Sequence, residues 1–552
     1  MSQTEQQKLV SRWGQLKTER STWFEHWQEI SDYLLPRSGK FLLQDHNRGR
    51  KRHNNIYDST GTRALRVLAA GMMSGMTSPA RPWFRLTTSD NELDDYGPVK
   101  VWLKQVTQIM RDVFARSNTY LALHSMYEEL GAFGTAPSLL LDDFDSVIHH
   151  YPLTAGEYCI ATDYRGRVTT LYREFDKTVG EIVAEFGINK VSATVKSLYD
   201  RGSLDQWVTL LHIIEPRSDR DPSMRDAKNK AWKSCYIEMG ANRDSYLRES
   251  GYDQFPVICP RWAATGGDTY GSSPGMEALG DIKQLQQEQL RKAQGIDYMT
   301  NPPLQMPSSL KNSEVDSLPG GVTFVDTTGP GNGIRTQFDV RLELNHLLAD
   351  IQDVRGRITS IFYADLFLML ANQTDKRMTA TEVAERHEEK LLMLGPVLER
   401  LHNEMLIPKV DLTFSRMLAA GIVPPPPPEL QGQNLNVDFV SMLAQAQQAV
   451  GTNSVDRFVG TLGQIAQVKP DVLDKLDADK WADVYSDMLG IDPELVVPSD
   501  KVALIRKARA EASQKAQQAE AAPQVAAAAK NASQIDPQNL RDVIGMFSGY
   551  SS

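Results

Sequence analysis

Apolar positions in this chain recur mostly at the three- and four-residue spacing of amphipathic helices. The pattern predicts one long helix over residues 9–34 and a Met-rich buried helix over 64–76, with Asp58 or Ser59 as its N-cap. Helical spacing returns over residues 99–141. The N-terminal part therefore contains several helices, each with one buried face.

The texture of the sequence changes after residue 146. Short segments there are rich in β-branched and aromatic residues, which is typical of strands. These segments cover residues 158–161, 168–172, 208–213 and 232–237. The first half of the chain is therefore expected to be a mixed α+β body.

A Gly-rich turn then leads into two further long helices. Ser273 is the expected N-cap of the first, with Pro274 at its first helical position. A narrow apolar stripe runs from there to residue 299, and a second stripe begins near residue 339 and covers about 25 residues. The segment between them carries prolines, glycines and short β-like runs, so the two helices flank a small β-rich insertion.

A polar break over residues 371–377 follows the second of these helices. Thr379 to Glu382 fits a capping box, which starts a third long helix with an expected kink at Gly395-Pro396. Five consecutive prolines, 424–428, then mark a boundary. Short helices are expected after it at residues 442–450, 455–468 and 481–489, before an Ala-, Gln- and Lys-rich tail from residue 501.

The composition limits the size and the class of the protein but does not indicate a function. The chain has 552 residues, 41% hydrophobic and 24% charged, which is enough for several modules. Its formal net charge of -10 argues against a protein that grips nucleic acid tightly, but permits a channel through which DNA slides. The basic run over residues 48–53 is interpreted as a solvated loop or a subunit contact, and we assign it no function.

Targeting and redox signals are weak. No apolar run approaches the roughly 18 to 20 residues that span a bilayer, so no membrane association is expected, and the protein should stay in the cytoplasm of the cell that makes it. The three cysteines, Cys159, Cys235 and Cys259, lack the spacing of a zinc or redox site, and a disulfide scaffold is not expected.

We searched the sequence for catalytic and ligand-binding patterns. No nucleotide-binding P-loop occurs, and the Gly-rich segment 329–333 is interpreted as a turn. The acidic residues Asp142, Asp143 and Asp145 lie near His149 and His150, but their spacing favours a solvated acidic loop over a metal site. We therefore predict no enzymatic activity, no cofactor and no metal.

Three segments carry a resemblance to a known family. They are residues 57–84, residues 261–275, and the run from Met378 to Arg386 that leads to Leu401, Glu404 and Pro408. In this order they resemble the portal proteins, or head-to-tail connectors, of short-tailed, podovirus-type bacteriophages. The resemblance covers roughly residues 13–428. It implies a predominantly helical α+β subunit that assembles as a ring.

The resemblance also implies a division of the chain into named parts. The body would be the wing, the two long helices the stem, the insertion the clip, and the C-terminal part a crown followed by a helical barrel or flexible tail. The implied boundaries are wing 1–265, stem 266–299 and 339–366, clip 300–338, tunnel loop 367–378, kinked helix 379–423, crown 424–497 and barrel or tail 498–552.

The implied function is passive. A homododecamer at the head-tail vertex of the virion would conduct double-stranded DNA during packaging and ejection, dock the terminase large subunit and tail or adaptor proteins, and nucleate procapsid assembly with the major capsid and scaffolding proteins. Internal core or ejection proteins are further candidate partners. Asn372, Gln373, Lys376 and Arg377 would face the DNA from the tunnel loop.

Two alternatives stay open from the residues alone. The loop that carries Lys376 and Arg377 fits a simple surface turn between helices equally well. The whole chain also fits an oligomeric scaffold or adaptor that never contacts DNA, because acidity and amphipathic helices are natural in such a protein.

Overall fold

The structure is a computed structural model. It describes residues 4–41, 55–90, 93–94, 96–224, 226–241, 246–301, 304–305, 335–336, 344–371, 393–430, 432–440, 459–465, 469, 477–481, 497 and 502–513. The chain divides into two units, Met1–Val450 and Gly451–Ser552. The basic run 48–53, most of the insertion and the capping box at Thr379 lie outside the described residues.

The N-terminal part of the first unit is mainly helical. The first helix begins in a capping box, in which the Thr4 side chain accepts from the Gln7 backbone and Gln7 Oε1 accepts from Thr4 N at 3.2 Å. Helix patterns predicted over 9–34 and 64–76 are confirmed. The helices are α1 (Glu5–Tyr33), α2 (Thr60–Met76), α4 (Gly97–Arg116) and α5 (Thr119–Phe133).

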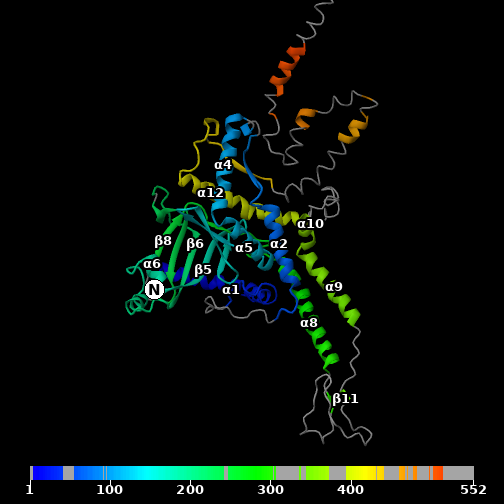
Figure 1. Cartoon of the computed structure of the whole chain (residues 1–552). Helices are drawn as coiled ribbons and strands as arrows, with labels where there is room; N and C mark the ends of the chain where they lie inside the picture. The colour runs from blue at the N-terminus through cyan, green and yellow to red at the C-terminus, as the bar shows by residue number, and fades with distance from the viewer. Residues whose placement is uncertain are drawn as a thin grey trace, which may run out of the picture. The chain divides into compact units, whose positions relative to one another are not determined.

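A five-stranded antiparallel sheet forms the part of the body next to α1 (Figure 1). All four predicted strand segments are confirmed as members of it. Its strands are, in spatial order, β4 (Tyr158–Thr162), β5 (Val168–Thr178), β6 (Trp207–Pro216), β7 (Trp232–Glu238) and β8 (Arg248–Tyr252).

Both faces of this sheet are covered by helices. Trp13 of α1 stacks on Tyr172 with 6.2 Å between ring centroids, and Leu211 packs in the same cluster. The neighbouring Leu210 packs on the opposite face with α6 (Val179–Phe186) and α7 (Ala193–Asp200). Alternation along each strand thus gives the sheet two apolar faces and a helix layer on each.

Two smaller sheets close the body. Strand β2 (Ser138–Asp143) pairs with both β3 (Val147–Pro152) and β9 (Val257–Ile258). Strand β1 (Phe84–Thr88) pairs antiparallel with β12 (Leu435–Phe439), which follows the proline run. The chain therefore returns to the body after residues 424–428.

Helices α8 (Pro274–Thr300) and α9 (Leu344–Ile361) lie side by side and extend away from the body (Figure 1). Ser273 caps α8 as predicted, its Oγ accepting from Met276 N at 3.1 Å. The described ends of the insertion pair antiparallel as β10 (Leu304–Gln305) and β11 (Arg335–Thr336). The helix–insertion–helix order is thus present.

One predicted helix is shorter than expected. The pattern over 339–366 predicts a single helix, but α9 ends at Ile361 and α10 (Ala364–Ala371) starts anew. Tyr363 between them has a φ of 53°, and its ring lies 6.5 Å from that of Trp262. Burial of the adjacent Phe362 and this aromatic contact turn the chain where spacing alone would continue the helix.

The third long helix also contains an irregularity. Residues 393–401 are helical through the expected kink site, and a π-helix at His402–Leu406 precedes α12 (Ile407–Ala419). Pro408 has no N–H to donate to the carbonyl of residue 404, which explains why the regular ladder is broken there. In the second unit, residues 459–465, 478–481 and 502–513 are helical, and Arg506 Nη2 binds Asp479 Oδ1 at 2.7 Å.

Among the described helices, none combines the length and apolar character needed to cross a lipid bilayer.

Candidate functional site

The predicted DNA-facing residues Asn372, Gln373, Lys376 and Arg377 lie outside the described residues. Helix α10 ends at Ala371 on one side of them, and helix resumes at residue 393 on the other. The described part of the chain instead defines how the body holds the helix pair α8–α9. That junction is built around the residues that precede α2.

Asp58 is the centre of the junction. Its Oδ2 accepts from Arg355 Nη2 of α9 at 2.7 Å and from Gln289 Nε2 of α8 at 3.0 Å. Its Oδ1 accepts from Thr60 N at 2.9 Å and Thr60 Oγ1 at 2.5 Å. One carboxylate therefore joins the start of α2 to both long helices, although the N-cap of α2 is Ser59, whose side chain makes no capping bond.

The electrostatics of Asp58 favour its charged form. Burial by itself would raise the pKa of this carboxyl, but the hydrogen bonds from Thr60 and Arg355 and the charge of Arg355 outweigh burial and lower the pKa. The side chain of Asp58 is buried, whereas that of Arg355 is 36% exposed. The junction therefore holds a fixed negative charge between two helices.

Gln286 of α8 binds the backbone of the same segment. Its Oε1 accepts from Tyr57 N at 2.6 Å and Asp58 N at 2.8 Å, and its Nε2 donates to Asp58 O at 2.9 Å. Gln286 is buried beside the apolar residues Ile282 and Leu285. The amide thus satisfies three backbone groups that the approach of α8 removes from water.

Two glycines allow the close approach of helices around the junction. A Cβ at Gly71 of α2 would lie 2.1 Å from Phe367 Cγ of α10, and one at Gly131 of α5 would lie 2.7 Å from Leu65 Cδ1. A larger side chain at either position would collide with its neighbour. The segment 57–84 therefore contributes to the junction through Asp58 and through Gly71, whose lack of a side chain makes room for Phe367.

A second polar contact joins the other two segments that carry the family resemblance. Arg261 Nη2 donates to Glu404 Oε1 at 2.6 Å and Arg261 N to Glu404 Oε2 at 2.9 Å, while Arg400 Nη1 lies 3.3 Å from Oε1. Burial alone would lower the pKa of Arg261, but Glu404 reverses this and raises it. Arg261 Nη2 also binds the carbonyl of Gly166, at the β4–β5 turn, at 2.7 Å.

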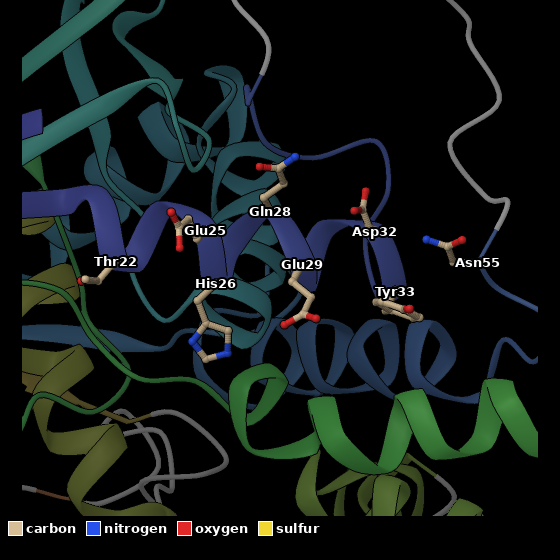
Figure 2. A pocket seen from close by; sticks show the side chains of 8 residues that line it. All are labelled: Thr22, Glu25, His26, Gln28, Glu29, Asp32, Tyr33 and Asn55. Atoms are coloured by element: carbon tan, nitrogen blue, oxygen red, sulfur yellow. The ribbon is translucent and has the colours of Figure 1, made fainter. Parts of the chain in front are cut away.

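A hollow with a volume of about 610 Å³ lies along α1. Figure 2 shows Glu25, His26 and Glu29 on one stretch of the helix, with Asp32 further along it and Asn55 on a separate segment of the chain. Glu29 pairs with Lys283 of α8, and burial together with Glu29 raises the pKa of Asp32. The hollow is open and acidic, and Glu29 helps to hold α8 against α1.

The acidic residues Asp142 and Asp143 near His149 bind different partners and do not form one cluster. Asp142 pairs with Arg416 at 2.9 Å, Asp143 Oδ2 accepts from Ser146 N at 2.9 Å, and His150 is buried. Within the residues that the structure describes, no three His, Cys, Asp or Glu side chains come together as a metal site would require.

The sequence pointed to Asp58, Arg261 and Glu404 as members of recognisable segments, but missed what each binds. Gln286 and Arg355 were not singled out. A polar residue on the buried stripe of α8, where apolar residues were expected, is the one signal that could have found Gln286.

A mixed helix and sheet body that carries an antiparallel pair of long helices is the fold class expected of a connector subunit. The chain belongs to the bacteriophage head to tail connecting protein family, which it matches over residues 6–497. The predicted relation to portal proteins of short-tailed phages is confirmed. Members of this family are structural proteins, which agrees with the prediction of no enzymatic activity.

Three relatives illustrate the match. The chain is 66% identical over 552 residues to the probable portal protein of Bordetella phage BPP-1, with all of both chains covered. It is 46% identical over 518 residues to the portal protein of Salmonella phage epsilon15, covering 94% of this chain and 93% of that one. Identity to the portal protein of Escherichia phage T7 is 21% over 441 residues, 76% of each chain.

Proposed function

We propose that twelve copies of this chain form a ring at the head-tail vertex of a virion, and that the ring conducts double-stranded DNA during packaging and ejection. Besides family membership, one observation on the structure supports ring assembly. The end of the α8–α9 pair that is remote from the junction exposes Ile296, Tyr298 and Met299 of α8 and Leu348 of α9, each at least 39% accessible. Apolar side chains that a single subunit leaves exposed are covered by neighbours in a closed ring.

The junction supports this function because a conduit needs its helix pair held at a fixed angle. Asp58 and Gln286 bind α8 and α9 to the body at one end. In the proposed ring, the inner wall would consist of these helices and the body would form the outer wing. A loosely held pair would give a channel of variable width.

We assign the parts of the chain accordingly. The wing covers residues 1–265, the stem 266–299 and 339–366, the clip 300–338, the tunnel loop 367–378, the kinked helix 379–423, the crown 424–497 and the barrel or tail 498–552. Strand β12 falls in the assigned crown and pairs with β1 of the wing, so the crown would start on the wing itself.

The proposed mechanism is passive. The sequence carries no P-loop, so ATP hydrolysis would belong to a terminase large subunit that docks on the clip. Tail or adaptor proteins would bind the same end after packaging. Major capsid and scaffolding proteins would meet the wing during procapsid assembly in the host cytoplasm, and internal core or ejection proteins would meet the crown.

The apolar helix ends give the first test. Replacing Ile296 and Met299 by Glu should prevent ring formation in native mass spectrometry of the full chain, while circular dichroism stays that of the wild type. Rings that form in undiminished yield would remove these residues from the subunit interface. The scaffold alternative predicts no closed ring in either protein.

The tunnel loop gives the second test. The double substitution of Lys376 and Arg377 by Ala should lower the amount of DNA packaged or retained in phage particles without changing ring assembly. A matched control removes two exposed basic residues from α7 and its end, Lys196 and Arg201. If the wild type, the loop variant and the control package equal amounts of DNA, the loop does not face the DNA and the surface-turn alternative is favoured.

A further inference from the structure

A lysine and a histidine meet in the interior of the body. Lys409 of α12 is 0% exposed and His150 of β3 is 1% exposed. Lys409 Nζ lies 3.0 Å from His150 Nε2, and His150 Nδ1 lies 3.4 Å from Ser138 Oγ. The contact fastens α12 to the β2–β3 hairpin.

The surroundings hold both residues in place. Asn118 clamps the backbone of His150 from both sides, accepting from His150 N at 2.8 Å and donating to His150 O at 2.7 Å. Thr413 Oγ1 donates to Lys409 O at 2.7 Å. The backbones of both residues are thus hydrogen-bonded, and their side chains are buried where α12 packs on the hairpin.

Two positive charges at this distance in a dry site repel strongly, so the closed contact disfavours protonation of both groups. With His150 neutral, Lys409 can donate to Nε2 while Nδ1–H donates to Ser138. Burial lowers the pKa of Lys409 to about 7, and burial followed by the charges of Lys409 and His149 lowers the pKa of His150.

Other titratable groups on the packed elements do not neutralise this pair. Asp142 and Arg416 form a separate ion pair between the same two elements, and Glu404 binds Arg261. Of the described groups, His149 is the one besides Lys409 whose charge acts on His150. The remaining titratable groups on β2, β3, α4, α5, α12 and the π-helix are Asp143, Tyr151, Lys100, Lys104, Arg111, Asp112, Arg116, Tyr120, His124, Tyr127, Glu128, Glu129, Asp411 and His402.

We propose that the Lys409–His150 contact makes the packing of α12 on the β2–β3 hairpin dependent on protonation. The packing is most stable with both groups neutral, and each proton that the pair takes up weakens it. Acidification would thus free the C-terminal end of the third long helix from the body. The ion pair between Arg416 and Asp142 would then still join the two elements.

Hydrogen exchange of the full chain tests the proposal. In the opened state Lys409 is solvated and binds a proton that the closed state excludes. The opening constant of residues 407–419 and 147–152 should therefore rise tenfold as the pH is lowered from 9 to 8. In Lys409→Met, which carries no proton, the opening constant should not change with pH. The wild-type to variant ratio at each pH removes the intrinsic pH dependence of exchange.

Two further variants sharpen the result. Lys409→Arg, whose guanidinium stays charged, should open more readily than the wild type at pH 9 and without pH dependence. His149→Gln, which alters the exposed neighbour, should keep the wild-type slope. If Lys409→Met does not fold, Lys409→Gln replaces it in the same comparison. A wild-type to variant ratio that stays constant from pH 9 to pH 7 would overturn the proposal.

Discussion

Arg261 and Glu404 are 143 residues apart in the chain, yet they form an ion pair in which the buried arginine contacts both oxygens of a half-buried carboxylate. The pair joins the entry to α8 with the π-helix before α12. Arg261 also holds the β4–β5 turn through the carbonyl of Gly166. Segments that are recognisable in the sequence are therefore neighbours in the fold, and this contact is one physical reason for their residue types.

Removing the carboxylate should be costly. Glu404→Ala leaves a buried guanidinium without its counter-charge, which is expected to lower the free energy of unfolding by about 3 kcal/mol. Asp438→Ala is a matched control, since its pair with Arg85 is exposed, and should cost less than about 1 kcal/mol. Urea titration followed by tryptophan fluorescence measures both. Equal losses would contradict a special role for Glu404.

Asp58→Asn should loosen the helix pair. An amide at this position presents an N–H to the donors of Arg355 or Thr60, and the expected loss is about 2 to 4 kcal/mol. Hydrogen exchange in residues 344–361 should accelerate. Asp353→Asn on the same helix, where the side chain is 71% exposed, should leave exchange unchanged. Unaltered exchange in Asp58→Asn would show that the Asp58 carboxylate is not needed to hold the pair.

Asp58 also has a defined pH dependence. Because its pKa is lowered on folding, its stabilisation is present above the unfolded value near 3.8 and is lost as pH falls through the folded value. The stability difference between wild type and Asp58→Asn should therefore be constant from pH 5 to pH 8. A difference that shrinks already at pH 6 would mean that the carboxylate is not held as described.

Gly71→Ala tests the packing of α2 on α10. The new methyl would collide with the buried ring of Phe367, and the strain should cost about 2 kcal/mol despite the better helix propensity of Ala. Gly280 lies in α8 with open space around it, so Gly280→Ala should instead stabilise by about 0.5 to 1 kcal/mol. Thermal unfolding of the two variants should shift in opposite directions.

Glu129 should make the body less stable as pH rises. Burial raises its pKa to about 7, above the unfolded value of 4.5, so its contribution is full below 4.5 and is lost as pH rises through 7. The span corresponds to about 3 kcal/mol. Glu129→Gln should remove this loss, and the stability of the variant relative to the wild type should grow between pH 5 and pH 8. A constant difference would indicate an ordinary carboxyl.

Local structure was predictable because it depends on spacing. The strands at 158–161 and 208–213, the long N-terminal helix and the Ser273 cap all follow from periodicity and capping chemistry, and the structure confirms them. The turn at Tyr363 was not predictable, since it depends on Trp262, a residue a hundred positions away.

The partners of the site residues were not predictable for the same reason. Nothing near Asp58 in the sequence indicates that Gln286 and Arg355 reach it, and nothing near Lys409 indicates that its neighbour is a histidine. Such contacts are fixed by tertiary packing. The predicted tunnel-loop residues, Asn372, Gln373, Lys376 and Arg377, stay a prediction.

The central claim is that this chain works as a ring with a DNA-wide channel. Electron microscopy of the purified full chain, with class averages viewed down the symmetry axis, tests it most directly. We expect closed rings, twelve-fold in the virion, with α8 and α9 around a hole that admits a DNA duplex with its hydration layer. A monodisperse monomer under assembly conditions, or a ring whose hole is narrower than a duplex, would contradict the account.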